Sequence, residues 1–223
     1  MTVSTDPDPA APTADRTDSP SRTGTRRFGA GWLALVLAFG LLVGAAIGFL
    51  GPTLGTPKDD SAEAGFLRDM STHHAQAVEM SMIAHANSTD TYVVTLAGDI
   101  ALTQHGQIST MLAWLRDWNL SPTGSQPAMA WMPEAQGSVR NGLMPGMATP
   151  DQLATLRKAT GKDLNIQYLT LMRQHHLGGL HMAQAILKQS DEQNVTDLAD
   201  TMVNGQQSEI NLIDSMLKRI QQT

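Results

Sequence analysis

The sequence predicts an all-α protein: a four-helix bundle made of two duplicated helical hairpins, with one transmembrane helix ahead of it. Long stretches place their apolar residues at helical spacing, and no segment shows the two-residue alternation of a half-buried strand. The C-terminal part also repeats itself. His73 and His74 recur as His175 and His176, 102 residues later, and the two copies align without a gap. An uncharged apolar segment near the N-terminus accounts for the remaining helix.

The N-terminal region divides into a tail and an apolar segment. Residues 1–27 are rich in Pro, Thr, Ser, Asp and Arg and contain almost no large apolar side chain, so we expect a disordered tail. Residues 28–50 form an uncharged apolar stretch of 23 residues, long enough to cross a bilayer and longer than the usual core of a cleaved signal. This stretch is predicted to be a transmembrane helix that acts as a signal anchor.

The charges around this segment predict its orientation. Arg22, Arg26 and Arg27 lie shortly before it, and two aspartates follow it at positions 59 and 60. The positive-inside rule then places the tail in the cytoplasm and the chain after about residue 53 outside the cell membrane. A long cleavable signal peptide is the alternative, because Val-Gly-Ala at 43–45 loosely resembles a cleavage site. Both interpretations export the C-terminal domain.

The composition limits the chemistry of the exported domain. The chain has no cysteine, so soft-metal ligands would have to be Met and His, and it contains 13 Met against 4 Phe and 2 Tyr. The tail carries equal numbers of Asp and Arg, so the net charge of −6 belongs to the exported domain. This charge argues against nucleic acid as a partner and is compatible with cations.

A short linker, 51–58, is expected to lead into a helical domain that spans 59–223. The first helix of this domain is predicted to begin at Asp60, with Glu63 three residues later as a capping box, and to end near Ala86.

The middle of the domain joins the two copies of the repeat. A second helix is predicted at about 90–118, and 119–149, with four prolines and several glycines, is expected to be a long ordered loop. Thr149, followed by Pro at the first helical position and by Gln152, predicts a capped short helix over 150–160.

The second copy repeats the hairpin. A fourth helix is expected over 162–189, and Ser190 with Gln193 predicts the start of a fifth that reaches about Gln221. Two long hairpins joined by one crossover form a four-helix bundle, in which the two helices carrying His-His pairs can face one another.

The repeated positions on these two helices form stripes of metal-capable side chains. Residues three and four apart on a helix are neighbours. The two corresponding stripes are Met70, His73, Ala77, Met80 and Ala84, and Met172, His175, Gly179, Met182 and Ile186. Because a thioether combined with imidazole is the ligand set expected for Cu(I), the sequence predicts copper as the bound ion. The predicted ligands are His73, His74, His175, His176, Met70, Met172, Met80 and Met182.

The second helix of each hairpin carries amides and carboxylates that could orient these histidines. Gln104, Gln206 and Glu209 are predicted in this supporting role. A structural interpretation stays open beside the metal site, because Met at core spacing is often flexible filling and a buried His is often a satisfied core residue. Of the other histidines, His85 is expected to end its helix and His105 to have a structural role.

Catalytic chemistry finds no support in the sequence. A di-iron carboxylate bundle needs Glu-x-x-His on two helices, and the domain has none. No His-Glu-x-x-His, Gly-x-Ser-x-Gly or phosphate-binding glycine loop occurs either. We therefore expect a binding protein rather than an enzyme.

The exported domain resembles the bacterial family called domain of unknown function 305. The resemblance covers about 59–221, and its carriers are GFLRDMSTHHAQAVEMS, QHGQISTMLAWL, MAWM, MPGMAT and YLTLMRQHHLGGLHMA. It implies a ferritin-like fold, and some members are implicated in periplasmic copper binding and resistance. Departures from the family pattern suggest that the halves are not equivalent. The first repeat has Gln107 where the pattern prefers Glu, and the second has Gly178–Gly179 and His181 where the first has Gln76, Ala77 and Glu79.

The sequence as a whole predicts a membrane-anchored, extracytoplasmic protein that binds copper for storage, buffering or resistance. A non-metal structural or interaction module of a cell-envelope complex is the alternative. The expected partners are a metal ion and the membrane, with a second copy of the chain or an envelope protein as further candidates.

Overall fold

The computed structural model describes residues 29–50, 55–135 and 137–222, in two compact units that divide after Gly51. Throughout these ranges the secondary structure is helical, with one isolated bridge between Arg140 and Leu143 and no strand. The all-α class is confirmed. Its ferritin-like subclass stays a prediction.

The first unit contains helix α1 (Ala30–Leu50), which lies within the apolar segment 28–50. Among the described residues, no helix was found that is both long enough and apolar enough to cross a membrane, so the expected transmembrane helix is not supported. The predicted disordered tail, 1–27, and residues 51–54 of the predicted linker lie outside the described residues.

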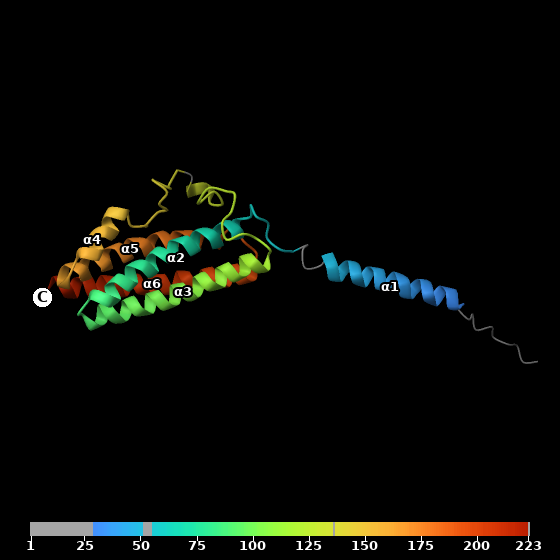
Figure 1. Cartoon of the computed structure of the whole chain (residues 1–223), viewed down its shortest axis with the longest axis horizontal. Helices are drawn as coiled ribbons and strands as arrows, with labels where there is room; N and C mark the ends of the chain where they lie inside the picture. Colours follow the sequence, from blue (N-terminus) through green and yellow to red (C-terminus); the bar gives the residue numbers. More distant parts are fainter. Residues whose placement is uncertain (1–28, 51–54, 136, 223) are drawn as a thin grey trace, which may run out of the picture. The chain divides into compact units, whose positions relative to one another are not determined.

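The second unit is built from two helical hairpins. Helix α2 packs against α3, α5 packs against α6, and α2 also packs against α5, which joins the hairpins. Figure 1 shows these four long helices running side by side, with the crossover segment and the short α4 at one side of them. The bounds are α2 (Ala62–Asn87), α3 (Thr91–Asp117), α4 (Pro150–Lys158), α5 (Gly161–Ile186) and α6 (Gln193–Gln221). Two hairpins joined by one crossover is the arrangement that the duplication predicts.

Two of the helix starts agree with those predicted from the sequence, and two differ. Asp90 caps α3 by accepting from the Tyr92 and Val93 amides, and Thr149 forms the predicted capping box of α4 with Gln152. The prediction that Asp60 starts the first helix is wrong by one residue, because the Ser61 hydroxyl is the group that accepts from the Ala64 amide.

The turn between α5 and α6 also differs from the prediction. Helix α5 ends at Ile186 rather than residue 189, because the Gln189 and Ser190 amides both turn back to the Ile186 carbonyl. The N-cap of α6 is Glu192 rather than Ser190, whose hydroxyl accepts from the Glu192 amide.

The core has two apolar clusters, one toward each end of the paired helices α2 and α5. One holds Met70 and Met182 together with residues of the crossover loop, and the other holds Met80 and Met172. Since Met70 shares a cluster with Met182, and Met80 with Met172, the two stripes run antiparallel. The core therefore confirms that 70–84 lies beside 172–186.

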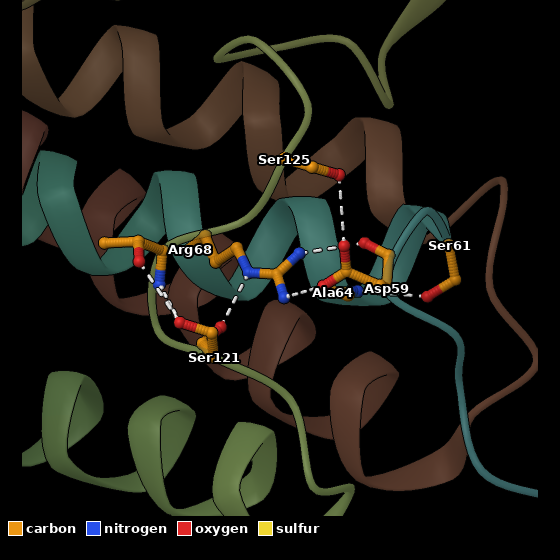
Figure 2. Close-up of polar contacts among 7 residues, drawn as sticks. Asp59, Ser61, Ala64, Arg68, Ser121 and Ser125 are labelled. Atoms are coloured by element: carbon orange, nitrogen blue, oxygen red, sulfur yellow. Dashed lines mark hydrogen bonds and ion pairs between the residues drawn. The ribbon is translucent and has the colours of Figure 1, made fainter.

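Arg68 forms hydrogen bonds with both the segment that precedes α2 and the start of the crossover loop. Its guanidinium donates to the Asp59 backbone carbonyl at 2.8 Å, to the Asp59 carboxylate and to the Ser121 carbonyl at 3.0 Å, as Figure 2 shows. The hydrogen bond from Arg68 also lowers the pKa of Asp59. These contacts fasten two segments that are far apart in sequence onto the first turns of α2. They border a recess of about 470 Å³ that the four paired histidines do not line.

Candidate metal centre

The two His-His pairs meet where α2 packs against α5. The rings of His73 and His175 lie 3.8 Å apart between centroids, tilted by 36°. The His175 Nε2 atom donates to the backbone carbonyl of His73 at 2.9 Å. The duplication therefore brings its most distinctive residues into direct contact across the interface between the hairpins.

All four imidazoles are buried, with at most 1 % of each residue exposed. Each also uses its Nε2 atom in the same way, facing an oxygen that accepts. His73 donates to the Pro145 carbonyl at 3.1 Å, and His175 donates to the carbonyl already described. His74 faces the amide oxygen of Gln107 at 2.8 Å, and His176 faces the Glu209 carboxylate at 2.6 Å. Since these oxygens are acceptors, the ring proton lies on Nε2 in all four.

The other ring nitrogen of each histidine has no hydrogen-bond partner among the residues that the structure describes. The Nδ1 atoms of His73, His74, His175 and His176 are buried and make no hydrogen bond with the described residues. A buried polar atom without a partner costs about 1–3 kcal/mol, so four at equivalent positions call for an explanation. With the proton held on Nε2, each Nδ1 presents a lone pair, which is what a metal ligand requires.

The electrostatics keep the rings of His73, His74 and His175 neutral. Burial lowers the pKa of His73 to about 4 and that of His74 to about 3, and it places the pKa of His175 well below the usual value. The neighbouring histidines add to this effect, because a charge on one ring disfavours a charge on the next. At neutral pH these three side chains are uncharged and their lone pairs are available.

The four predicted methionine ligands are buried too, but they divide between two places. Met70 and Met182 belong to the cluster under the crossover loop, and Met80 and Met172 belong to the other. The histidines lie between these pairs along α2 and α5. Within the described part of the chain, no group of three or more His, Cys, Asp or Glu side chains is arranged to hold a metal ion.

The supporting residues are only partly those predicted. Glu209 contacts His176 as expected, whereas the residue that contacts His74 is Gln107. The sequence could have indicated Gln107, because it occupies in the first repeat the position that Glu209 occupies in the second. No hydrogen bond to a histidine is described for Gln104 or Gln206, and each has a buried side-chain atom without a partner in the described structure.

The remaining histidines lie outside this centre. His85 lies in the last turn of α2, two residues before the helix ends at Asn87, and its Nδ1 atom lies 3.0 Å from the Val94 carbonyl at the start of α3. His105 is exposed, so the expected structural role is wrong: it lies one position beyond the buried Gln104 and points away from the core.

Comparison with known proteins places this domain. The family described as "Domain of unknown function (DUF305)" matches residues 63–217, most of the chain. The chain belongs to this family. A comparison with curated proteins found no match.

Solved structures agree with this assignment. The crystal structure of a putative secreted DUF305 protein from Streptomyces coelicolor is 43 % identical, covers 73 % of this chain and 96 % of its own, and has a TM-score of 0.68. A DUF305 fragment from Deinococcus radiodurans is 29 % identical, covers 73 % of this chain and 99 % of its own, and has a TM-score of 0.60. CopM in its Cu(I)-bound form is 19 % identical, covers 71 % of this chain and 96 % of its own, and has a TM-score of 0.54, a likeness of fold.

The structure explains one departure of this chain from the DUF305 pattern, the Gly178–Gly179 pair. A Cβ atom on Gly178 would lie 2.0 Å from the Pro145 carbonyl oxygen, and one on Gly179 would lie 2.5 Å from the Gln206 side chain. A Cβ atom on Gly146, at φ +85°, would lie 2.5 Å from the Gln174 carbonyl oxygen of α5. Gly178 therefore leaves room for the crossover loop to lie directly on α5 beside the histidines, and Gly179 leaves room for the Gln206 side chain of α6.

Side chains of α2 also hold the crossover loop in this position. Gln76 exchanges two hydrogen bonds with the backbone of Ala148, at 2.7 and 2.9 Å, and His73 donates to Pro145. Each of these contacts joins two residues that are 72 positions apart in the sequence. Together they hold residues 145–148, which we call the strap, against the His73 side of the centre. Sequence reasoning missed both anchors, since no local pattern pairs a helix with a loop so distant.

Proposed function

We propose that this protein binds copper as Cu(I), through imidazole Nδ1 atoms and thioethers, in the core between α2 and α5. The observation that carries the proposal is the set of four buried histidines whose Nε2 protons are all donated and whose Nδ1 lone pairs are unpartnered. These buried lone pairs support the binding of an ion that accepts them.

The donor set fits a soft, low-valent ion. Neutral imidazole and thioether suit Cu(I), and the chain offers no thiolate that would favour zinc. The residues that would hold copper ions are the four paired histidines with Met70, Met80, Met172 and Met182, all of them buried. Related structures support the proposal by their descriptions, which give CopM in Cu(I)-, Cu(II)- and Ag-bound forms.

Binding, rather than catalysis, is the proposed role. A buried centre covered by a fastened strap suits retention of an ion, so storage, buffering or delivery is the function that we infer. A structural module of the cell envelope is the second candidate. It is favoured by one observation, that every Nε2 atom of the four histidines already has a partner within the protein.

We also propose that the protein is held at the cell membrane, with its C-terminal domain outside. The uncharged segment 28–50 and the arginines that precede it support this orientation. Fractionation of cells should then recover the intact chain with the membranes. Release of a protein that starts after residue 45 into the medium would overturn the anchor.

Metal titration of the purified protein tests the function. A bound ion stabilises the fold by mass action, by about 2.7 kcal/mol at a hundredfold excess over the dissociation constant. Under reducing conditions, added Cu(I) should therefore raise the melting temperature. A melting temperature that Cu(I) leaves unchanged would favour the structural candidate.

Substitutions locate the ligands. Replacing His73 and His175 together with Ala, or His74 and His176 together, should abolish tight Cu(I) binding, whereas His85→Ala serves as the control that retains it. Replacing Met70 and Met172 with Leu should weaken Cu(I) far more than Zn(II), because a thioether is a poor ligand for the harder ion.

A further inference from the structure

The two halves of the centre differ in charge at one pair of equivalent positions. Position 107 in the first repeat corresponds to position 209 in the second. Gln107 accepts from His74 at 2.8 Å, and Glu209 accepts from His176 at 2.6 Å. The two contacts use the same ring atom at equivalent positions of the repeat. They differ in that the amide is neutral and the carboxylate carries a negative charge.

The surroundings strengthen the electrostatic effect of this one charge. His176 is fully buried and the Glu209 side chain is 23 % exposed, so their contact is largely shielded from water. The other Nε2 atoms of the centre donate to two backbone carbonyls and an amide, none of which is charged. Interactions between charges are much stronger in such an environment than at the surface.

We propose that Glu209 divides the centre into two halves with different preferences for ionic charge. The half around His176 accepts ions of higher charge and binds every cation more tightly, whereas the half around His74, backed by neutral Gln107, is restricted to singly charged soft ions. This inference rests on the proposed function, since it requires metal at the Nδ1 atoms.

Two physical effects of the carboxylate act in the same direction. By accepting the Nε2 proton it increases the electron density on the ring, which makes the Nδ1 of His176 a stronger donor. It also attracts the bound ion directly, and this attraction is proportional to the charge of the ion. The direct effect on the binding free energy is therefore about twice as large for a doubly charged ion as for a singly charged one.

The test compares Glu209→Gln with Gln107→Glu, which are nearly isosteric changes. Titration of the full chain with Ag(I) and separately with Cu(II) gives the affinity of each variant for both ions. Removing a group that supports a metal-bound histidine costs about 10–100-fold in affinity. For Glu209→Gln we expect a loss of about tenfold for Ag(I) and about a hundredfold for Cu(II). Gln107→Glu should strengthen binding, and more for Cu(II) than for Ag(I).

Glu79→Gln is the matched control. Glu79 lies on α2, pairs with Arg157 at the surface and is 40 % exposed, so the change removes one negative charge without touching a histidine. Its affinities should equal those of the unmodified protein. Equal affinities for Glu209→Gln and Glu79→Gln would overturn the inference, as would equal losses for the two ions. If the unmodified protein binds neither ion, the proposed function fails instead. If Glu209→Gln does not fold, the inference is decided by whether Gln107→Glu shows the expected gain in metal affinity.

Discussion

The close approach of the strap to α5 makes Gly178→Ala a demanding test of the structure. Alanine is favoured over glycine inside a helix by about 1 kcal/mol, so without a tertiary contact the substitution would stabilise the protein. The new Cβ atom, however, would lie 2.0 Å from the Pro145 carbonyl oxygen, where ordinary contact begins at 3.4 Å. The backbone on one side must therefore move by about 1.4 Å to restore ordinary contact.

A movement of that size disrupts the hydrogen bond from His73, which is now 3.1 Å long. Leaving its buried donor unpaired costs about 1–3 kcal/mol, and overpacking costs about 1–3 kcal/mol more. After subtracting the gain in helix propensity of about 1 kcal/mol, we expect a net loss of about 1–5 kcal/mol. For a domain of this size each kcal/mol lowers the melting temperature by about 2–4 °C.

Thermal melting followed by circular dichroism measures the effect, with Gly106→Ala as the matched control. Gly106 is also a helical glycine, but a Cβ atom there would meet nothing within 4 Å. This variant should be as stable as the unmodified protein or up to about 1 kcal/mol more stable. If Gly178→Ala melted at or above the temperature of Gly106→Ala, the described packing of the strap on α5 would be wrong.

Two further predictions concern stability. Because burial holds the pKa of His73 at about 4, that of His74 at about 3 and that of His175 well below its usual value, the unfolded chain binds up to three more protons between pH 6.5 and 4. Stability should be fully present above pH 6.5 and fall toward pH 4 by up to about 4 kcal/mol per pH unit. Urea unfolding at several pH values measures this slope, which His74→Leu should reduce by about a third, and a flat profile would contradict the buried neutral rings. Arg68→Leu should cost about 2–4 kcal/mol in urea unfolding, because its hydrogen bonds to the linker and the loop are lost. Arg157→Leu, at an exposed ion pair, should change stability by less than about 1 kcal/mol, and equal effects would argue against the described role of Arg68.

The fold was predictable because its signals are local or periodic. Helical spacing and the absence of strand alternation predict the helices, and Thr149 with Gln152 predicts the start of α4 within one residue. The gap-free duplication predicts that the stripes around His73 and His175 face each other, since each hairpin needs the other to cover its apolar face. Adjacent residues that both favour a cap are harder to separate, and Ser61 rather than Asp60 caps α2.

The candidate site was predictable in its residue types and less so in its contacts. The histidines and thioethers follow from the repeat. The oxygens that fix the ring protons do not, because two of them are backbone carbonyls placed by tertiary packing, as with Pro145. Gln107 could have been found from its equivalence to Glu209. The strap could not, since it depends on the absence of side chains at Gly178 and Gly146.

The position of the ring protons has a consequence for the heat of metal binding. Protein sites usually give up protons when they bind a metal, so the measured enthalpy includes the ionisation of the buffer that takes them up. Here His73 and His74 are already neutral, their protons lie on nitrogens that face acceptors, and the opposite nitrogens are free. Loading of these ligands near neutral pH should therefore release no proton, and calorimetry in buffers with different ionisation enthalpies should give the same heat.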